Sequence, residues 1–476
     1  FPLAICSLPC HWRQQHGQSS YCLHRACSGL RKCANWYSPV TSVHADSPTV
    51  QSGGLIREND CRPDERVASD SWVSTPAEAG CPEGWQEDLG ESIPMSLREH
   101  PRLGSIASKL ASQHRLSHED GLLMMNDPDL PSVLALADIS KRARYGSSVF
   151  FNSNLHINQT NVCVLACRFC AFRRGVSATD AYSLDIDEYL ARLAPFSEYI
   201  DEVHTVGGLH PEWTIEHYEM LFSSIKQNYP HVSVKALTAV EIKHLASISH
   251  LSISQTLTRL RDSGLDILPG GGAEILSDDV RDIICRGKES SGEYLHIHRT
   301  AHELGIPSNC TMLFGTIETD AARVDHLISL RELQDESGGF QCFVPYPFLP
   351  DHTRLPQAQL ASANEVLRII AVSRLLMDNI PHIKAYRMNI GDRLAQLALG
   401  CGADDIDGTV GHEEIMHSAG STTSLSDGRS ELARLVRDAG YTPVQRDSIY
   451  TNFRRYQDPP PPGRSQLPVA NQIVAG

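Results

Sequence analysis

Three cysteines share one short segment, Cys163-Val-Leu-Ala-Cys167-Arg-Phe-Cys170. Thiolates are soft ligands, and groups of cysteines bind zinc, Cu(I) or iron–sulfur clusters. Structural zinc sites draw four ligands from two separated pairs, but the later cysteines lie far from one another: Cys285, Cys310, Cys342 and Cys401. Three thiolates on a four-iron cluster leave one iron open to a small molecule. The segment therefore predicts a 4Fe–4S cluster, with a redox-active disulfide or a zinc loop as the alternative.

The net charge and the hydropathy of the chain limit which molecules it is expected to bind. The chain has 42 Lys and Arg against 57 Asp and Glu, a net charge of −15. This balance disfavours non-specific binding to nucleic acids or to anionic membranes. The most apolar run, residues 366–377, is interrupted by Arg368 and Arg374 and is too short to span a bilayer. We therefore expect a cytoplasmic protein with a small-molecule substrate, no nucleic-acid partner and no membrane span.

The two ends of the chain differ in composition from its middle. Seven of the 14 cysteines precede residue 95, and residues 1–45 contain no Asp or Glu but several basic residues and serines. This bias resembles an organelle transit peptide, which makes plastid import an alternative location. A disulfide-rich secreted module and a mispredicted start are further interpretations. We expect residues 1–94 to be a disordered or targeting-like extension and residues 446–476 to be a Pro-rich C-terminal tail.

Between these ends, strand-like segments alternate with helix-like segments. We expect a helical lead-in over residues 95–144 and a catalytic domain over residues 145–445. Eight candidate strands occupy residues 149–157, 202–206, 232–237, 265–268, 308–313, 340–344, 382–386 and 404–410. Helical periodicity separates most of them, including a helix capped by Thr214 and helices over residues 279–304, 321–336 and 364–379. Eight such units predict an α/β fold, a (β/α)8 TIM-type barrel with its chemistry on the loops after the strands.

Several longer motifs accompany the cysteine segment. They are His156-Ile-Asn-Gln-Thr-Asn161, Val206-Gly-Gly-Leu-His-Pro211, Lys235-Ala-Leu-Thr-Ala-Val-Glu241, Leu268-Pro-Gly-Gly-Gly-Ala-Glu274, Ile297-His-Arg-Thr-Ala-His302, Arg331-Glu-Leu-Gln-Asp335 and Gly402-Ala-Asp-Asp-Ile-Asp-Gly-Thr-Val410. Through them, residues 100–445 resemble the aminodeoxyfutalosine synthase family, radical S-adenosylmethionine enzymes of the futalosine route to menaquinone. Arg387 departs from the family pattern, in which a second aromatic residue is expected after Tyr386.

The resemblance implies a radical S-adenosylmethionine barrel whose cofactors are a 4Fe–4S cluster on Cys163, Cys167 and Cys170 and S-adenosylmethionine. It implies a transferase that adds the 5′-deoxyadenosyl radical to 3-[(1-carboxyvinyl)oxy]benzoate and forms 6-amino-6-deoxyfutalosine with loss of carbon dioxide. A one-electron reductant of flavodoxin or ferredoxin type would be the protein partner. The positions that match S-adenosylmethionine sites in such barrels are Gly207, Gly208, Glu241, Asn309 and Glu318.

The two carboxylates of such a substrate need cationic or amide donors at the mouth of the barrel. His210, His352 and Arg354 lie on loops that suit this role, and no catalytic residue is assigned. His298 and His302 are interpreted as a solvated helix surface rather than a metal site. Two alternatives stay open. One is a sister radical enzyme, either cyclic dehypoxanthine futalosine synthase or an FO synthase subunit. The other is a non-catalytic iron–sulfur or zinc protein that senses redox state.

Overall fold

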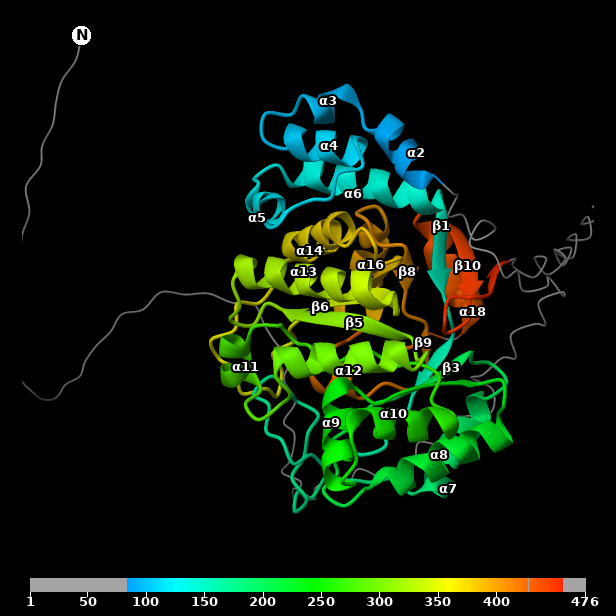
Figure 1. Ribbon diagram of the computed structural model, residues 1–476. Coiled ribbons are helices and arrows are strands. Elements are labelled where there is room, and N and C mark those ends of the chain that lie inside the picture. The colour runs from blue at the N-terminus through cyan, green and yellow to red at the C-terminus, as the bar shows by residue number, and fades with distance from the viewer. Residues whose placement is uncertain (1–83, 427, 457–476) are drawn as a thin grey trace, which may run out of the picture. The chain divides into compact units, whose positions relative to one another are not determined.

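The computed structural model describes residues 84–426 and 428–456 (Figure 1). The transit-like residues 1–45, the seven N-terminal cysteines and most of the Pro-rich tail lie outside the described residues. Among the helices that are described, none is both long and apolar enough to cross a membrane.

Strands form the centre of the fold, and all of their pairings are parallel except that of β10 with β11. They are β1 (Ser148–Phe151), β2 (Asn154–His156), β3 (Glu202–Thr205), β4 (Ser233–Ala236), β5 (Ser308–Phe314), β6 (Phe340–Pro347), β7 (His382–Ala385), β8 (Asp405–Ile406), β9 (Thr409–Val410), β10 (Thr442–Arg446) and β11 (Phe453–Arg455). β1 pairs with β8, and β2 pairs with β9 and β3. The order continues from β3 to β4 on one side and from β8 through β7 and β6 to β5 on the other.

Two isolated bridges close this arrangement into a barrel. Lys235 pairs with Ile267, and Leu268 pairs with Ser308, so residues 267–268 link β4 to β5. The eight expected strands correspond to β1–β2, β3, β4, residues 267–268, β5, β6, β7 and β8–β9. The barrel prediction is thus confirmed. All seven residues of β5 are buried, as expected where helices cover the outside and side chains fill the inside.

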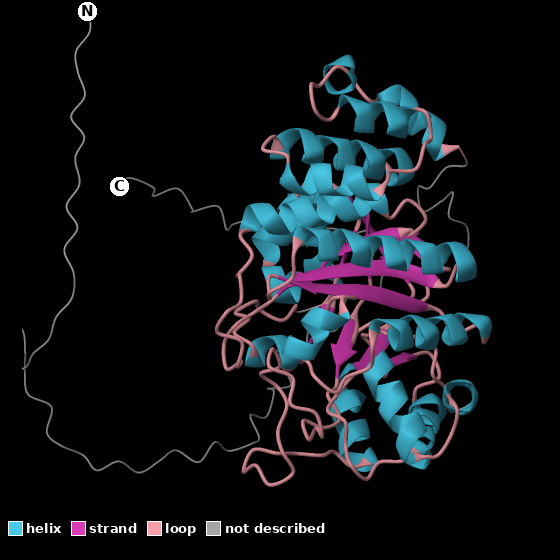
Figure 2. Cartoon of the chain, turned by 60° about the vertical axis from the view of Figure 1, so that its left-hand side comes forward, coloured by secondary structure: helices cyan, strands magenta, loops and turns pink. Residues whose placement is uncertain are grey.

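Helices flank the strands, and long loops gather on one side (Figure 2). The helices are α2 (Trp85–Ser92), α3 (Met95–Arg98), α4 (Gly104–Ala111), α5 (His118–Asn126), α6 (Leu130–Tyr145), α7 (Ile186–Leu193), η1 (Ala194–Phe196), α8 (Ile215–Asn228), α9 (Ala239–Ile248), α10 (Ile253–Asp262), α11 (Asp278–Ile284), α12 (Ser291–Glu303), α13 (Asp320–Ser337), α14 (Ala363–Leu376), α15 (Arg387–Ile390), α16 (Asp392–Leu399), α17 (Ile415–Ser418) and α18 (Arg429–Asp438). The single helix expected over residues 279–304 is two helices, α11 and α12, because a capping box of Ser290 and Glu293 starts a new helix there.

The fold extends further at both ends than the sequence predicted. α2 lies within residues 1–94, yet Leu89 and Ile93 are buried, and the Arg144 guanidinium lies 3.9 Å from the centre of the Trp85 ring. β11 lies within residues 446–476 and pairs antiparallel with β10. The boundaries predicted at residues 94 and 446 are therefore corrected. α2 has eight residues and β11 has three, which is too few to show a clear periodicity. The prediction for the two ends therefore rested on their composition alone.

Candidate active site

The cysteine loop, residues 163–170, leaves the barrel beyond the carboxyl end of β2. Its backbone is tied to segments that are distant in sequence. The Val164 N–H donates to the Leu209 carbonyl at 3.1 Å, and the Arg168 N–H donates to the Ile284 carbonyl at 2.7 Å. The loop is therefore held between the loop after β3 and the end of α11.

The three thiols of this loop are free and differ in exposure. Cys167 is buried, while Cys163 and Cys170 are half-buried. Burial raises the pKa of Cys167 to about 12. Burial also raises the pKa of Cys170. The free thiols of Cys167 and Cys170 are therefore neutral, and a bound metal would reverse this because coordination removes the thiol proton.

The donor set of the loop fits an iron–sulfur cluster in number and kind. Within residues 84–426 and 428–456, no three His, Cys, Asp or Glu side chains are gathered closely enough to hold a single metal ion. A four-iron cluster differs from a single ion because each thiolate binds a different iron, so its ligands stand further apart. Cys167 packs in an apolar group with Ile284, Leu313 and Phe348, which would shield a cluster from water.

The glycine pair after β3 lies directly against the chain that enters the cysteine loop. A Cβ on Gly208 would lie 2.1 Å from the Val162 carbonyl oxygen, and one on Gly207 would lie 2.8 Å from that of Thr160. The Gly208 N–H donates to the Thr160 carbonyl at 2.8 Å. Only glycine allows this approach, so the pair fixes the position of the residues that precede Cys163.

Glu241 holds the glycine pair from the other side. It lies in the first turn of α9, where it forms a capping box with Thr238. One carboxylate oxygen accepts from the Gly207 N–H at 3.0 Å and the other from the Thr238 N–H at 2.7 Å. Burial raises the pKa of Glu241. The structure thus shows a positioning contact, and a direct contact with S-adenosylmethionine stays a prediction.

Glu318 is similarly engaged within the protein. It accepts hydrogen bonds from the Gly315 and Thr316 N–H groups and pairs with Arg323 at 2.7 Å. Burial alone would raise the pKa of Glu318, but the Arg323 charge and the Thr316 hydroxyl outweigh it and hold the pKa below its ordinary value. Glu318 therefore fixes the turn after β5, and its predicted role with the cofactor is not tested.

Three of the buried side-chain oxygens that have no hydrogen-bond partner within the described protein lie on a barrel strand or on the segment before the cysteine loop. They are the side-chain oxygens of Asn158, Gln159 and Asn309. Asn158 and Gln159 precede the cysteine loop, and Asn309 lies on β5. S-adenosylmethionine carries an ammonium group, ribose hydroxyls and an adenine amino group, all of which donate. The residues present therefore fit this group, since its donors match acceptors that have no partner within the protein.

The predicted substrate residues lie at different places on this face. His210 is half-buried and stacks on Trp213 with ring centres 4.4 Å apart. A cavity of about 480 Å³ beside it is lined by residues that include Asp185, Trp213 and His217. His352 is exposed in a loop with a φ of 59°. None of these contacts shows a substrate site, so both residues stay predictions.

Arg354 reaches the cysteine loop itself. Its guanidinium donates to the Ala166 carbonyl at 2.6 Å and to the Cys167 carbonyl at 3.3 Å. Its own N–H donates to the Arg168 carbonyl at 2.7 Å. These contacts brace the loop through the segment after β6, and the contact with a substrate carboxylate stays a prediction.

Sequence reasoning missed two residues beside the loop, Lys288 and Cys285. The Lys288 ammonium pairs with Glu274 and lies 5.7 Å from the centre of the Phe169 ring. Cys285 is buried in the same apolar group as Cys167. The fold brings these residues to the loop, and their spacing in the sequence does not indicate it. The one local sign is that Lys288 directly follows a glycine, Gly287.

The interior of the barrel beside the loop is polar. The rings of His156 and His204 lie 4.3 Å apart. Burial lowers the pKa of His156 to about 3 and that of His204 well below its ordinary value, so both imidazoles are neutral. Burial also raises the pKa of Asp407 to about 6, and one of its oxygens has no partner. Such groups are typical of a site that receives a polar ligand.

The structure gives partners to two histidines of α12 and to Arg387. His298 is fully buried and bonds to the Ser308 hydroxyl at 2.9 Å, as does His302 at 2.7 Å. The interpretation of a solvated helix surface is corrected, because one face of α12 lies against the start of β5. Arg387, the departure from the family pattern, pairs with Asp392 at 2.7 Å and so has a local structural partner.

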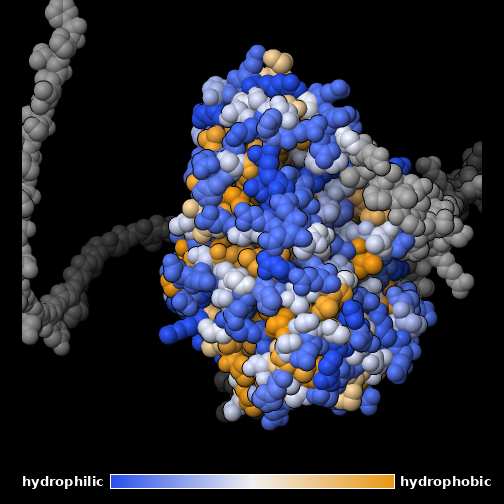
Figure 3. Space-filling view, viewed as in Figure 1, coloured by the Kyte–Doolittle hydropathy of each residue, from blue (hydrophilic) through white to orange (hydrophobic). Residues whose placement is uncertain are grey.

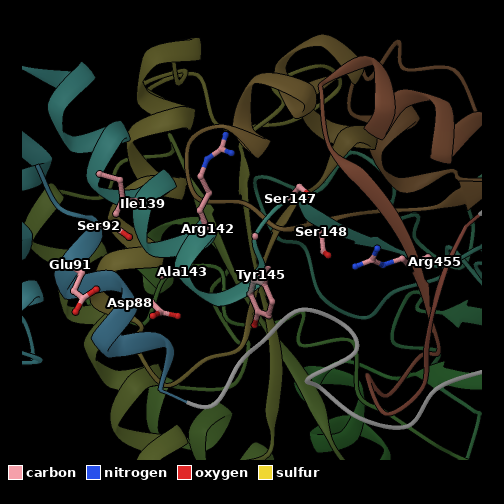
Figure 4. Close-up of a pocket in the computed structure, with 11 residues that line it drawn as sticks. Asp88, Glu91, Ser92, Ile139, Arg142, Ala143, Tyr145, Ser147, Ser148 and Arg455 are labelled. Atoms are coloured by element: carbon pink, nitrogen blue, oxygen red, sulfur yellow. The ribbon is translucent and has the colours of Figure 1, made fainter.

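A separate cavity of about 650 Å³ lies at the amino end of β1 (Figure 4). Asp88 and Glu91 of α2, Arg142 of α6 and Arg455 of β11 face it. Ser148, the first residue of β1, also lines it. Because the cysteine loop lies beyond the carboxyl end of β2, this cavity is not part of the candidate active site.

Comparison with known proteins places this geometry in a family. Residues 157–330 match the Radical SAM superfamily, and residues 337–459 match the CofH/MqnC C-terminal region. The aminodeoxyfutalosine synthases of Thermus thermophilus and Streptomyces coelicolor are 43% and 41% identical, over 74% and 75% of this chain and 96% of each relative. The chain belongs to the aminodeoxyfutalosine synthase family. It is thus a radical S-adenosylmethionine enzyme, whose cofactors are a 4Fe–4S cluster and S-adenosylmethionine.

More distant relatives agree with the fold. The cyclic dehypoxanthine futalosine synthase of Streptomyces coelicolor is 36% identical over 80% of this chain and 94% of its own length. Among solved structures, methylornithine synthase matches with a TM-score of 0.58 at 17% identity, over 71% of this chain and 96% of that one. This second likeness supports the barrel fold alone.

Proposed function

We propose that this chain joins the adenosyl carbon of S-adenosylmethionine to the enol-ether carbon of 3-[(1-carboxyvinyl)oxy]benzoate, with loss of the enol carboxyl group, to give 6-amino-6-deoxyfutalosine. When bound, the cluster supplies the electron that breaks a C–S bond of S-adenosylmethionine. The observation that carries the proposal is the 43% identity to an aminodeoxyfutalosine synthase over 96% of that enzyme. The reaction would serve menaquinone formation by the futalosine route.

Different residues of this chain would bind the cluster, position the cysteine loop and bind S-adenosylmethionine. Cys163, Cys167 and Cys170 would hold the cluster. Gly207 and Gly208 set the backbone against the cysteine loop, and Glu241 locks Gly207 through a 3.0 Å hydrogen bond. Asn309 would accept a hydrogen bond from S-adenosylmethionine, because its side-chain oxygen is buried without a partner. Glu318 would fix the turn after β5.

The substrate would be bound through its two carboxylates. His210, His352 and Arg354 would meet the carboxylates, since a carboxylate held away from water needs a cation or donor. Arg354 already contacts the cysteine loop, so it would couple the loop to the substrate. Changing Arg354 to Gln should then favour release of free 5′-deoxyadenosine over the adduct.

We further propose a cytoplasmic location and a one-electron reductant of flavodoxin or ferredoxin type as partner. Plastid import concerns residues outside the described part and stays a prediction. The second candidate function is that of the sister family, favoured by the 36% identity to cyclic dehypoxanthine futalosine synthase. Anaerobic incubation with S-adenosylmethionine, dithionite and the enol-ether benzoate, read by mass spectrometry, separates the two: an adenine-containing adduct supports the proposal.

A further inference from the structure

The polar side chains inside the barrel differ in environment from those on its surface. Most of the face seen in Figure 3 is hydrophilic, and its polar side chains contact water. Inside the barrel, four side chains that can donate hydrogen bonds are nearly or partly buried, and they are named here the interior donor group: His156, His204, Lys235 and Lys384. A buried cation needs a partner from the protein or from a ligand. The partners of this group therefore indicate what the barrel holds.

The alternation of side chains along the strands turns the interior donor group inward. Leu155 of β2 and Val203 of β3 belong to the main apolar core. The residues that follow them, His156 and His204, therefore point to the opposite face, which is the inside of the barrel. The register of the strands places His204 beside both His156 and Lys235.

Two observations show that these side chains lie close together. The ring centres of His156 and His204 are 4.3 Å apart. Burial lowers the pKa of His204 well below its ordinary value, and the positive charges of Lys235 and Lys384 lower it further. Both lysines, which come from β4 and β7, are therefore within electrostatic reach of one imidazole.

The cations of this region exceed the carboxylates with which they pair. The Lys235 ammonium lies 3.3 Å from both carboxylate oxygens of Glu202. The Lys384 ammonium lies 2.6 Å from Asp405, which also binds the Arg446 guanidinium at 2.6 Å. Three cations therefore face two carboxylates. Because an ammonium group has three donors, Lys384 also keeps donors for a further acceptor, and an anion would balance the remaining charge.

Asp407 is an acidic group of the same interior, and it is compatible with such an anion. Burial raises the pKa of Asp407 to about 6, although the charges of Arg387 and Lys384 oppose this shift. One of its oxygens has no partner among the described residues. A second negative charge nearby would raise the pKa further, so Asp407 would take up a proton when an anion binds. The protonated carboxyl group could then donate a hydrogen bond.

The space between the interior donor group and the cysteine loop suits an aromatic ring. His204 is half-buried although strands flank β3 on both sides, so part of its ring borders a space within the barrel. Tyr386 lies two residues after Lys384, about 7 Å further along the strand direction. Its ring centre is 6.3 Å from that of Tyr346, which packs against the apolar group that contains Cys167. One level of aromatic side chains thus lies between the donors and the loop.

We propose that the interior donor group binds the ring carboxylate of 3-[(1-carboxyvinyl)oxy]benzoate, with Lys235, Lys384 and His204 as donors. The vinyl carbon must face the adenosyl carbon beside the cysteine loop, so the ring carboxylate points away from the loop and down the barrel. The loop residues proposed above would then meet the enol carboxylate. This inference rests on the proposed function, and it adds the residues that select a substrate with a carboxylate on its aromatic ring.

The test compares two ligands that differ only by this carboxylate. One is 3-[(1-carboxyvinyl)oxy]benzoate, and the other is 2-phenoxypropenoate, which keeps the enol ether and lacks the ring carboxylate. Anaerobic isothermal titration of the whole, cluster-loaded chain, with S-adenosylmethionine and without a reductant, measures both affinities in the absence of turnover. We expect wild-type protein to bind the benzoate at least about 100-fold more tightly, because buried donors disfavour an analogue that leaves them unpaired.

Two variants each remove a donor from the group. In Lys384→Met, Asp405 keeps its bond to Arg446, so its buried carboxylate is not left without a cation. His204→Leu removes an imidazole that takes part in no ion pair, and His204→Gln restores an N–H donor at the same position. Lys141→Met is the matched control, because Lys141 is also a buried lysine but lies on the helix α6.

The ratio of the two affinities distinguishes substrate contact from a structural role. We expect Lys384→Met and His204→Leu each to lose about tenfold or more of the preference for the benzoate, with the affinity for 2-phenoxypropenoate unchanged. His204→Gln should recover most of the preference, and Lys141→Met should match wild type. Equal weakening of both ligands, or a full preference in both variants, overturns the inference.

The proposed function is tested separately, by adduct formation in wild-type protein reduced with dithionite. A wild-type protein that forms the adduct but binds both ligands equally overturns this inference alone. A wild-type protein that forms no adduct but prefers the benzoate, with the preference lost in both variants, overturns the proposed function and supports the carboxylate site.

Discussion

Gly208 offers the most direct test of how the barrel positions the cysteine loop. A Cβ at this residue would lie 2.1 Å from the Val162 carbonyl oxygen. Such contacts are not tolerated below 3.0 Å, so the chain before Cys163 would have to move by about 1 Å. Gly208→Ala should therefore lower the free energy of unfolding by about 1–3 kcal/mol and turnover by about 100-fold, because the loop is displaced.

Gly175→Ala is the matched control for this variant. Gly175 follows the same loop, and the nearest atom to its added Cβ would be an Arg173 guanidinium nitrogen at an ordinary 3.7 Å. Urea unfolding gives the stability, iron and sulfide analysis gives cluster occupancy, and adduct formation gives turnover. Wild-type iron content and turnover in Gly208→Ala would refute the reasoning, as would equal damage from Gly175→Ala.

The remaining predictions concern charge and ligation. Alanine at any cysteine of the loop (Cys163, Cys167 or Cys170) should abolish iron binding, whereas Cys285→Ala should retain it; iron analysis after anaerobic reconstitution checks both. Lys288→Met should lower the midpoint potential of the cluster, because a buried cation beside the loop stabilises the more negative reduced state; an EPR redox titration with Lys243→Met on α9, a half-buried lysine that is also ion-paired, as control measures it, and an unchanged potential would count against the role. Burial lowers the pKa of Lys141 from 10.5 to about 8, so the folded state is penalised while this amine is protonated. Stability should rise between pH 8 and 10.5, and Lys141→Met should remove that rise and add up to about 3 kcal/mol at pH 7 in urea unfolding.

The sequence predicted what is encoded locally. The spacing of Cys163, Cys167 and Cys170 depends on one loop, and the eight strands appear as short segments, several of them followed by glycine or proline loops. Contacts between distant segments were not predictable in this way. Lys288, Cys285 and the Arg354 brace reach the loop only because barrel closure brings the ends of different strands together. α2 and β11 were not predicted for a different reason: each has too few residues to show the periodicity of a helix or a strand.

Glu241 shows a second limit of sequence reasoning. Its motif predicts a cofactor-binding position, but the motif does not say what the carboxylate touches. In the structure both oxygens accept from backbone N–H groups, one of them from Gly207. A residue that matches a binding motif can therefore act by holding its neighbour, and only the folded arrangement distinguishes the two roles.

The fate of the adenosyl group tests the central claim most directly. Wild-type protein, reconstituted anaerobically, is incubated with S-adenosylmethionine, dithionite and 3-[(1-carboxyvinyl)oxy]benzoate, and the products are separated and weighed by mass spectrometry. If the vinyl carbon is held closer to the adenosyl carbon than any transferable hydrogen, the main product is an adenine-containing adduct formed in step with carbon dioxide. Free 5′-deoxyadenosine formed in step with substrate loss, with no adduct, would contradict the proposed function and favour the sister chemistry.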